Sequence, residues 1–344
     1  MIVEREVALV PAAADGDEFG DEFGDATERF RAELTAHCYR MLGSLHDAQD
    51  VVQETYLRAW RGWAGFEGRA STRAWLYRIA TNACLSALRH SSRRFVPSGL
   101  GAPSDDPDAP VRPPVEDVAW LDPFPTPSGA ASADPAEIAV ARHSLRIALV
   151  ASLQHLPARQ RAVLVLRDVL EFSSAEVGSM LEMSVPAVKS ALQRARARLA
   201  EVQPQPDTTV EPDEPAARAV LDRYVDAFQR ADAVAMENLL RADASLELVG
   251  MRTWFSGRRT CAPHLSRHVL GEPGEYRMFV TSANGQPAAL AYRRNPETSR
   301  HEAFGVAVLD TDGVHLTRIT VFARADLLAW FGHPPTLPAD PPTV

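Results

Sequence analysis

Residues 173–199 read SSAEVGSMLEMSVPAVKSALQRARARL, and this stretch predicts two short helices joined by a tight turn. Ser173 and Glu176 have the spacing of a capping box, which satisfies free backbone N–H groups at a helix start. Ser184 ends the break at residues 182–184 and is suited to cap the second helix. Pro186 is tolerated in the first turn of that helix, where backbone N–H groups have no helical partner.

The second helix of this pair has an apolar stripe and a cationic face. The stripe has the spacing of a buried helix face, and it consists of Val185, Val188, Leu192, Ala195 and Leu199. No acidic residue interrupts the other face, which includes Lys189, Ser190, Gln193, Arg194, Arg196 and Arg198. A helix-turn-helix places such a helix in the major groove of DNA. A solvated basic face on an ordinary helix fits the same residues.

The composition indicates a globular protein of two or three domains. The chain has 344 residues, of which 46% are hydrophobic and 24% charged, both ordinary values for a folded protein. No apolar run approaches the roughly 20 residues that a membrane span needs. The first 20 residues carry acid where a signal peptide needs base. We therefore expect a cytoplasmic location and no membrane partner.

The net charge of −9 is unevenly distributed along the chain. Residues 1–28 carry a net −8, residues 95–137 carry −7 and residues 201–216 carry −5, so the remainder carries +11. The acid lies in the segments that resemble linkers, and the base lies in the predicted domains. That distribution is the one that contact with nucleic acid requires.

Neither the cysteines nor the histidines indicate a metal site. Cys38, Cys84 and Cys261 are scattered, with no CxxC pair, and we expect reduced thiols. His264 and His268 are one helical turn apart but lack a HExxH pattern, so we interpret them as surface histidines. We expect no metal and no cofactor.

Residues 25–92 predict three further helices. The first has one apolar face and ends at Gly43. The second, over residues 47–60, exposes a polar patch that consists of Asp47, Asp50, Gln53 and Glu54.

The third of these helices, over residues 71–90, follows a loop at residues 65–69. It mixes Trp75 and Tyr77 with Arg73, Arg78 and Arg89. Aromatic rings beside cations suit single-stranded DNA, whose bases stack and whose phosphates pair. Burial of Trp75 and Tyr77 in a core fits the same pattern.

Two long motifs resemble the extracytoplasmic-function (ECF) sigma factors of the sigma-70 family. DAQDVVQETYLRAW (47–60) with TRAWLYRIATNACLSALR (72–89) resembles their region 2. LQHLPARQRAVLVLRDVLEFSSAEVGSMLEMSVPAVKSALQRARARL (153–199) resembles their region 4. The resemblance implies two all-α domains, a region 2 helical bundle and a region 4 helix-turn-helix. It also implies two partners, core RNA polymerase and promoter DNA.

The resemblance implies three groups of contact residues. The residues that match the polymerase-docking surface are Asp47, Asp50, Gln53 and Glu54. Those expected to open and read the −10 element are Phe66, Arg69, Arg73, Trp75, Arg78 and Asn82. Those expected at the −35 element are Ser184, Lys189, Ser190, Gln193, Arg194, Arg196 and Arg198. Ser86 departs from the acid that members of the family often carry at its position, so contacts near the end of that helix are less well defined.

The segments around the two motifs are interpreted as linkers. We expect a disordered acidic N-terminus (1–24), region 2 (25–92), a flexible acidic Pro-rich linker (93–137), region 4 (138–200, with the helix-turn-helix at 173–199) and a second linker (201–216). Within the first linker, VAWLDPFPTP (118–127) contains Trp120, Leu121 and Phe124. This apolar run predicts a docking segment.

Residues 217–333 predict a third, α+β domain, followed by a tail at residues 334–344. Amphipathic helices at 217–229 and 234–240 precede a strand at 245–249, a helix at 257–270 and two hairpins. The hairpins turn at Asn284-Gly285 and at Asp312-Gly313. This order of elements resembles the SnoaL-like (NTF2-like) fold with an antiparallel sheet, and the whole chain is similar to SigJ-type sigma factors. The resemblance implies a domain that regulates regions 2 and 4 in cis.

SnoaL-like folds enclose a pocket, so a small-molecule ligand is a candidate partner of the third domain. The residues that could line such a pocket are Asp226, His264, His268, Arg277 and Tyr292. Sequence shows neither their convergence nor a suitable pKa, and we expect a sensory domain with no catalytic residues.

Two other functions fit parts of the sequence. One is a stand-alone helix-turn-helix repressor or activator, which leaves region 2 without a purpose. The other is a SnoaL-type small-molecule enzyme with a DNA-binding appendage. The sigma-factor interpretation uses all three domains, and we expect the free chain to be monomeric and not an enzyme.

Overall fold

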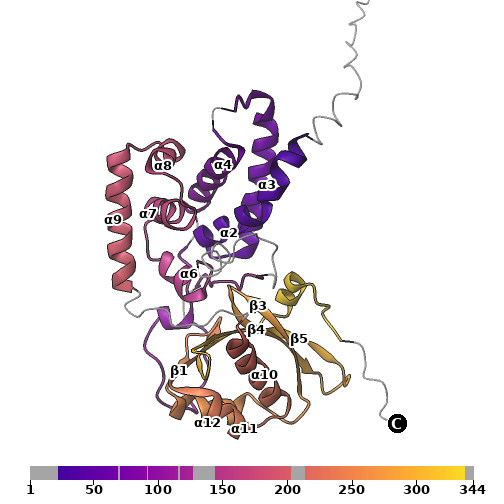
Figure 1. The fold of residues 1–344 in the computed structure, drawn as a ribbon. Helices are drawn as coiled ribbons and strands as arrows, with labels where there is room; N and C mark the ends of the chain where they lie inside the picture. Colours follow the sequence, from indigo (N-terminus) through magenta and orange to yellow (C-terminus); the bar gives the residue numbers. More distant parts are fainter. Residues whose placement is uncertain are drawn as a thin grey trace, which may run out of the picture.

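The computed structural model describes residues 22–68, 70–90, 92–114, 117–126, 144–202 and 214–337. Two helical groups lie side by side above an α+β domain (Figure 1). This arrangement confirms the predicted fold class, with two all-α domains and a C-terminal α+β domain. Within the described ranges, no helix is long and apolar enough to cross a membrane.

The first helical group consists of α2 (Arg31–Leu42), α3 (Leu45–Gly62) and α4 (Thr72–Ala87). A 3-10 turn, η1 (Glu28–Phe30), precedes α2, and another, η2 (Trp63–Gly65), follows α3. Gly43 ends α2 in the left-handed conformation, with φ of 71°. Ser44 and Ser71 cap α3 and α4, because each hydroxyl accepts a hydrogen bond from a first-turn backbone N–H.

The expectation of disorder over residues 1–24 is wrong for the last residues of that segment. Residues 22–27 are helical, and Phe23 is buried. Its ring lies edge-on to the rings of Trp60 and Trp63, at 5.2 and 5.4 Å between centroids. One aromatic side chain in this acidic segment is sufficient to hold the segment on α3, while residues 1–21 lie outside the described part of the chain.

His37 of α2 is fully buried against α4. Its Nε2 lies 2.9 Å from the Thr81 hydroxyl, which itself donates to the Tyr77 carbonyl, so Nε2 carries the proton. Nδ1 has no hydrogen-bond partner in the described structure. Burial, with the nearby charges of Arg40 and Arg73, lowers the pKa of His37 from 6.5 to about 3. His37 is therefore neutral in the folded protein.

This burial predicts acid sensitivity. Below about pH 6.5 the unfolded chain binds a proton at His37 and the folded chain does not. The free energy of unfolding is therefore highest above that pH and falls as the pH drops towards 3. When the pH is lowered from about 7.5 to about 5, the free energy of unfolding should fall by about 2 kcal/mol because of His37. His37→Gln should flatten this dependence in urea titrations, whereas His46→Gln, at an exposed site, should not. Equal slopes for both variants would contradict the prediction.

The second helical group consists of α6 (Ile147–Leu153), α7 (Ala158–Leu164), η4 (Val165–Val169), α8 (Ser174–Leu181) and α9 (Val185–Val202). The predicted capping box at Ser173 and Glu176 is confirmed, with both reciprocal hydrogen bonds present. Glu182 makes the predicted break in a left-handed conformation. The predicted helix from about residue 138 to residue 143 lies outside the described residues.

The predicted burial of the apolar stripe is wrong for one of its members. Val188, Leu192 and Ala195 of α9 are buried, but Val185 is 39% exposed. Val185 is the first residue of α9, directly after the turn. The buried part of the stripe holds α9 on α7 and α8.

The third domain combines three helices, a six-stranded sheet and a C-terminal 3-10 helix. The helices are α10 (Pro215–Gln229), α11 (Ala233–Leu239) and α12 (Arg258–His268). The strands are β1 (Leu240–Val249), β2 (Trp254–Ser256), β3 (Tyr276–Ala283), β4 (Gln286–Arg294), β5 (His301–Thr311) and β6 (Leu316–Phe322), followed by η5 (Ala325–Phe331).

The strands are in the order β2-β1-β6-β5-β4-β3. Both predicted hairpins are confirmed, and Asn284 and Gly285 have the positive φ angles, 56° and 64°, of a two-residue turn. The expectation of a wholly antiparallel sheet is wrong, because β1 pairs with β6 in parallel. No tight turn joins these two strands, since α12 and the β3–β5 meander lie between them in the chain, so the connection does not impose an antiparallel pairing.

The two faces of this sheet have different neighbours. On one face, Ala289, Leu309 and Ile319 pack with the apolar sides of α10, α11 and α12. On the other face, Leu290, Val308 and Phe322 join one apolar core with the helical groups, residues 95–124 and η5. The third domain is therefore packed onto the helical part through the face of the sheet opposite its own helices (Figure 1).

The expectation of a flexible linker is wrong for the described residues 92–114 and 117–126. Leu121 is 1% exposed, and its backbone N–H donates to the Phe95 carbonyl. Phe124 is also buried. The predicted docking segment thus docks within the chain, because its apolar side chains fill the junction between α2 and the third domain.

Candidate nucleic-acid and polymerase interfaces

The cationic face of α9 points away from the rest of the molecule. Every predicted −35 residue is exposed, namely Ser184, Lys189, Ser190, Gln193, Arg194, Arg196 and Arg198. Ser184 has a local role, because its hydroxyl accepts a hydrogen bond from the Ala187 N–H at 3.3 Å and caps α9. The other six form a continuous polar surface over about three turns of helix.

Neighbouring side chains orient three of the arginines. Arg194 donates to the Ser190 hydroxyl at 2.6 Å. Arg196 makes two hydrogen bonds to Asp168 at 2.7 and 2.8 Å, and the partner carboxylate raises the pKa of Arg196. Arg198 pairs with Glu201 at 2.9 Å. Carboxylate partners therefore hold the Arg196 and Arg198 guanidinium groups, whereas the partner of Arg194 is a neutral hydroxyl.

Sequence reasoning missed Asp168. It lies in η4, a π-helical turn. A π-helical turn has no sequence signal comparable to a cap, so the Asp168–Arg196 pair was not predictable from spacing.

An aromatic stack lies at the predicted −10 surface. Phe66 stacks on Trp75 at 4.7 Å and on Trp63 at 5.5 Å between centroids. All three rings are half-buried, so each keeps some surface for a base. Arg78 is exposed beside them on α4, and Arg69 lies outside the described residues.

Two of the predicted −10 residues instead face the second helical group. Arg73 pairs with Glu33 at 3.2 Å and lies over the Phe172 ring at 4.7 Å. Asn82 donates to the Met180 carbonyl at 3.4 Å. In this conformation α4 packs on α8, so the region 4 helices cover part of the predicted −10 surface.

The four predicted polymerase-docking residues lie along α3, and three of them are in ion pairs. Asp50 lies 3.2 Å from His46, Glu54 lies 2.6 Å from Arg58, and Asp47 lies 2.6 Å from Arg94. Gln53 is exposed between them. The missed members of this surface are Leu57 and Trp60, which are 47% and 40% exposed. Apolar side chains exposed beside polar ones are typical of a protein interface, and their spacing from Gln53 was the available signal.

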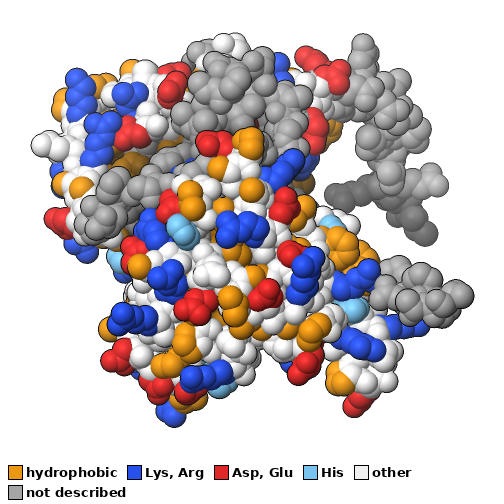
Figure 2. Space-filling model, turned by 60° about the horizontal axis from the view of Figure 1, so that its bottom comes forward, with side chains coloured by type: hydrophobic (Ala, Val, Ile, Leu, Met, Phe, Trp, Pro, Cys, Tyr) orange, Lys and Arg blue, Asp and Glu red, His pale blue; other side chains and the backbone are white. Residues whose placement is uncertain are grey.

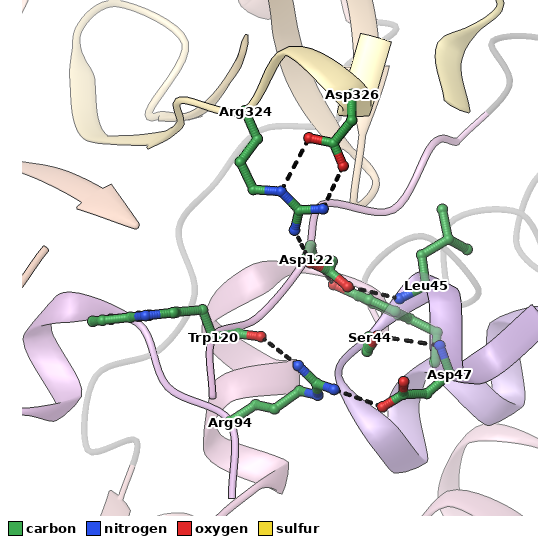
Figure 3. A network of polar contacts seen from close by, with 9 residues as sticks. Ser44, Leu45, Asp47, Arg94, Trp120, Asp122, Arg324 and Asp326 are labelled. Carbon is green, nitrogen blue, oxygen red and sulfur yellow. Dashed lines mark hydrogen bonds and ion pairs between the residues drawn. The ribbon is translucent and has the colours of Figure 1, made fainter. Parts of the chain in front are cut away.

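A polar network joins the start of α3 to the linker and the third domain (Figure 3). Asp122 accepts a hydrogen bond from the Leu45 N–H at 3.2 Å and one from Arg324 at 3.0 Å. Arg94 pairs with Asp47 and donates to the Trp120 carbonyl. Asp47, one of the four predicted polymerase-docking residues, is therefore paired with an arginine of the linker.

The five residues expected to line a ligand pocket do not converge at one site, although His264 lies beside His268 and Arg277 is the cross-strand partner of Tyr292. His264 is stacked on Phe255 and lies 2.8 Å from the Pro107 carbonyl, and His268 pairs with Asp108 at 2.9 Å. The Tyr292 hydroxyl donates to the Pro334 carbonyl, and Asp226 pairs with Arg230. Arg277 lies on β3, the edge strand at the far end of the sheet from β2. The interpretation of both residues as surface histidines is therefore wrong for His264, which is buried beside the linker, while His268 is exposed and pairs with a linker carboxylate.

The third domain does not repeat the cationic character of α9. Residues 214–337 contain fourteen arginines and fourteen acidic residues. On the face seen in Figure 2, basic, acidic and hydrophobic side chains alternate without a continuous basic area. A shallow charged hollow of about 1010 Å³ is lined by residues that include Glu275, Arg293 and Glu302, and it contains none of the five expected pocket residues.

Family models match both helical groups. Residues 27–94 match sigma-70 region 2, and residues 146–199 match sigma-70 region 4. The chain is 44% identical over 325 residues to the ECF RNA polymerase sigma factor SigG of Mycobacterium tuberculosis, which covers 93% of this chain and 86% of that protein. It is 29% identical to the ECF sigma factor SigW of Bacillus subtilis over 58% of this chain and 95% of that protein.

One solved structure has the same arrangement of domains. The crystal structure of the Mycobacterium tuberculosis ECF sigma factor SigJ matches with a TM-score of 0.57 and 22% identity. The match covers 88% of this chain and 98% of that chain, so it extends over the α+β domain. Two family models in the order of region 2 and region 4, together with a relative that matches over nearly the whole chain, establish that this protein belongs to the ECF sigma factors of the sigma-70 family.

Proposed function

We propose that this protein directs core RNA polymerase to specific promoters and acts in the cytoplasm. The observation that carries the proposal is the presence of both sigma modules in one chain, with the α9 face exposed. In this assignment α3 docks on polymerase, the Phe66–Trp75 stack and Arg78 contact the −10 element, and α9 reads the −35 element. Polymerase supplies the chemistry, and the chain contributes no catalytic residue.

Within the −35 surface, the residues divide by how firmly they are held. Lys189 and Gln193 project from the first half of α9, and it is the N-terminal part of a recognition helix that contacts base edges. Arg196 and Arg198 are held by acidic partners near its end and are suited to phosphate. We therefore assign base reading to the first pair, with Ser190 and Arg194 beside them, and positioning to the second.

The test of this function is run-off transcription with purified core polymerase and genomic promoter fragments. We expect initiation from a subset of fragments that share two sequence elements. Failure to initiate from any fragment would contradict the proposal. A stand-alone repressor or activator would bind DNA in the same assay without supporting initiation.

Lys189→Ala should weaken binding of the polymerase–sigma complex to such a promoter by about 1–3 kcal/mol if Lys189 contacts a base edge. If it contacts phosphate, the loss should be smaller and equal across promoters, and the salt dependence of binding should become shallower. Binding titrations at several salt concentrations measure both effects. Arg218→Ala, an exposed cation on α10, is the control. Identical titrations for the two variants would remove Lys189 from the interface.

We further propose that the third domain regulates the two sigma modules in cis. The support is its location, because the sheet shares an apolar core with α2, α6 and the linker. A SnoaL-type enzyme gains no support from the five residues expected to line a pocket, since they are engaged separately by the linker and by their own domain.

A further inference from the structure

The tip of the β3–β4 hairpin lies at the junction of the three domains. Asn284 and Gly285 form the turn, and the Asn284 side chain has no exposed surface. A two-residue hairpin turn is ordinarily a solvent-exposed feature, and asparagine is favoured there for its backbone conformation. Complete burial of this turn therefore indicates a role beyond the hairpin.

The Asn284 side chain hydrogen-bonds to three segments that are far apart in the sequence. Its amide nitrogen donates to the Tyr39 hydroxyl of α2 at 2.8 Å and to the Leu145 carbonyl before α6 at 2.9 Å. Its amide oxygen accepts a hydrogen bond from the Phe124 N–H of the linker at 2.8 Å. The Asn284 N–H donates back to the Phe124 carbonyl at 2.7 Å. One side chain thus contacts region 2, the linker and the start of region 4.

The residues beside Asn284 continue these contacts. The Gly285 N–H donates to the Thr126 hydroxyl at 3.1 Å. The Gln286 amide oxygen accepts a hydrogen bond from the Ile147 N–H, the first residue of α6, at 2.9 Å. The Gln286 amide nitrogen donates to Asp310 of β5 at 2.6 Å, which ties the tip to the body of the sheet.

We propose that the Asn284 hairpin tip is a latch that fixes region 2, the linker and region 4 relative to one another. Both amide hydrogens and the amide oxygen of Asn284 are used, and only the side-chain amides of Asn and Gln present this set of donors and acceptor. Release of the tip removes its hydrogen bonds to α2, the linker and the start of region 4, and leaves the direct hydrogen bonds from Arg40 of α2 to Ser144 in place. The α10–α12 core lies on the opposite face of the sheet, so the third domain can stay folded while the latch opens.

The functional consequence rests on the proposed sigma-factor function. In the latched form Arg73 and Asn82 face the region 4 helices, and Asp47 is paired with Arg94 of the linker. Opening of the latch frees α4 to move away from α8. The latch therefore opposes engagement of polymerase and the −10 element, and the released form is the one that engages both.

The test is Asn284→Asp in the full-length chain. This substitution replaces two donors with a carboxylate oxygen facing the Tyr39 hydroxyl and the Leu145 carbonyl, which leaves buried polar groups unpaired. The matched control is Asn295→Asp, the same change in a turn whose contacts lie within the third domain. Hydrogen exchange should quicken at least 10-fold at the Phe124 and Ile147 amides in Asn284→Asp and stay at the wild-type rate in Asn295→Asp. Small-angle X-ray scattering should show a larger radius of gyration for Asn284→Asp alone.

A second variant leaves the hairpin sequence unchanged and so distinguishes loss of the latch from misfolding of the hairpin. Tyr39→Phe keeps the buried ring and removes the hydroxyl that accepts from Asn284. It should raise exchange at the same amides, while amides of α10 stay protected in both variants. Wild-type exchange at Phe124 and Ile147 in both Asn284→Asp and Tyr39→Phe would overturn the latch.

Affinity for core polymerase shows whether a negative result counts against the latch or against the proposed sigma-factor function. We expect Asn284→Asp to bind core polymerase at least 5-fold more tightly than Asn295→Asp does. Faster exchange together with unchanged affinity would support the latch and overturn its role in polymerase binding. The absence of any polymerase binding by the wild-type chain and both variants would instead count against the sigma-factor function.

Discussion

Leu121→Ala is expected to lower the unfolding free energy by about 2–5 kcal/mol, the range for a fully buried leucine. Leu121 belongs to the linker but is 1% exposed in the core shared by the helical groups and the sheet. Its side chain lies so close to Gly43 that a Cβ there would approach Leu121 to 2.6 Å. The substitution leaves a cavity at this close contact, where α2 ends and α3 begins.

Urea unfolding followed by circular dichroism measures this loss. Leu57→Ala, a leucine on α3 that is 47% exposed, is the matched control and should change stability by less than about 0.5 kcal/mol. A loss of the same small size for Leu121→Ala would show that the linker is undocked in solution.

The double substitution Gln53→Ala and Glu54→Ala should weaken binding to core polymerase by about 3–4 kcal/mol, roughly 100- to 1,000-fold, if both residues are interface hot spots. Both lie on α3 beside Leu57 and Trp60, and neither side chain is part of the buried core. The fold should therefore be retained, with an unchanged melting temperature.

The measurement is an equilibrium titration of labelled core polymerase. Glu237→Ala, an exposed acid on α11, removes a similar charge away from α3 and should leave the affinity unchanged. If the double variant bound as tightly as wild type, the docking surface would have to lie elsewhere on the molecule.

Local features of this fold were predictable from the sequence. The Ser173–Glu176 capping box, the break at Glu182 and the Asn284-Gly285 turn each depend on residues within a few positions of one another. The apolar spacing of α9 likewise predicted which of its side chains point outwards. These features follow from backbone preferences that hold in any fold.

Features that join distant segments were not predictable. Asn82 and Met180 are separated by 98 residues, and Tyr39 and Asn284 by 245. The acidic, proline-rich composition of residues 93–137 is typical of a flexible tether, yet a few apolar residues in its described part are buried because the sheet covers them. The predicted pocket was wrong for a similar reason, because Pro107 and Asp108 of the linker, distant in sequence, hydrogen-bond to the two histidines.

The strands that cover Leu121 are synthesised after the linker. Leu121 leaves the ribosome roughly 200 residues before β6, and at about 5–20 residues per second this leaves an interval of about 10–40 s. During that interval the region 2 helices are already made, the region 4 helices are completed at Val202, and the strands that cover the linker are translated afterwards. Each nascent molecule therefore passes through a stage in which both groups of helices are complete and the sheet is not.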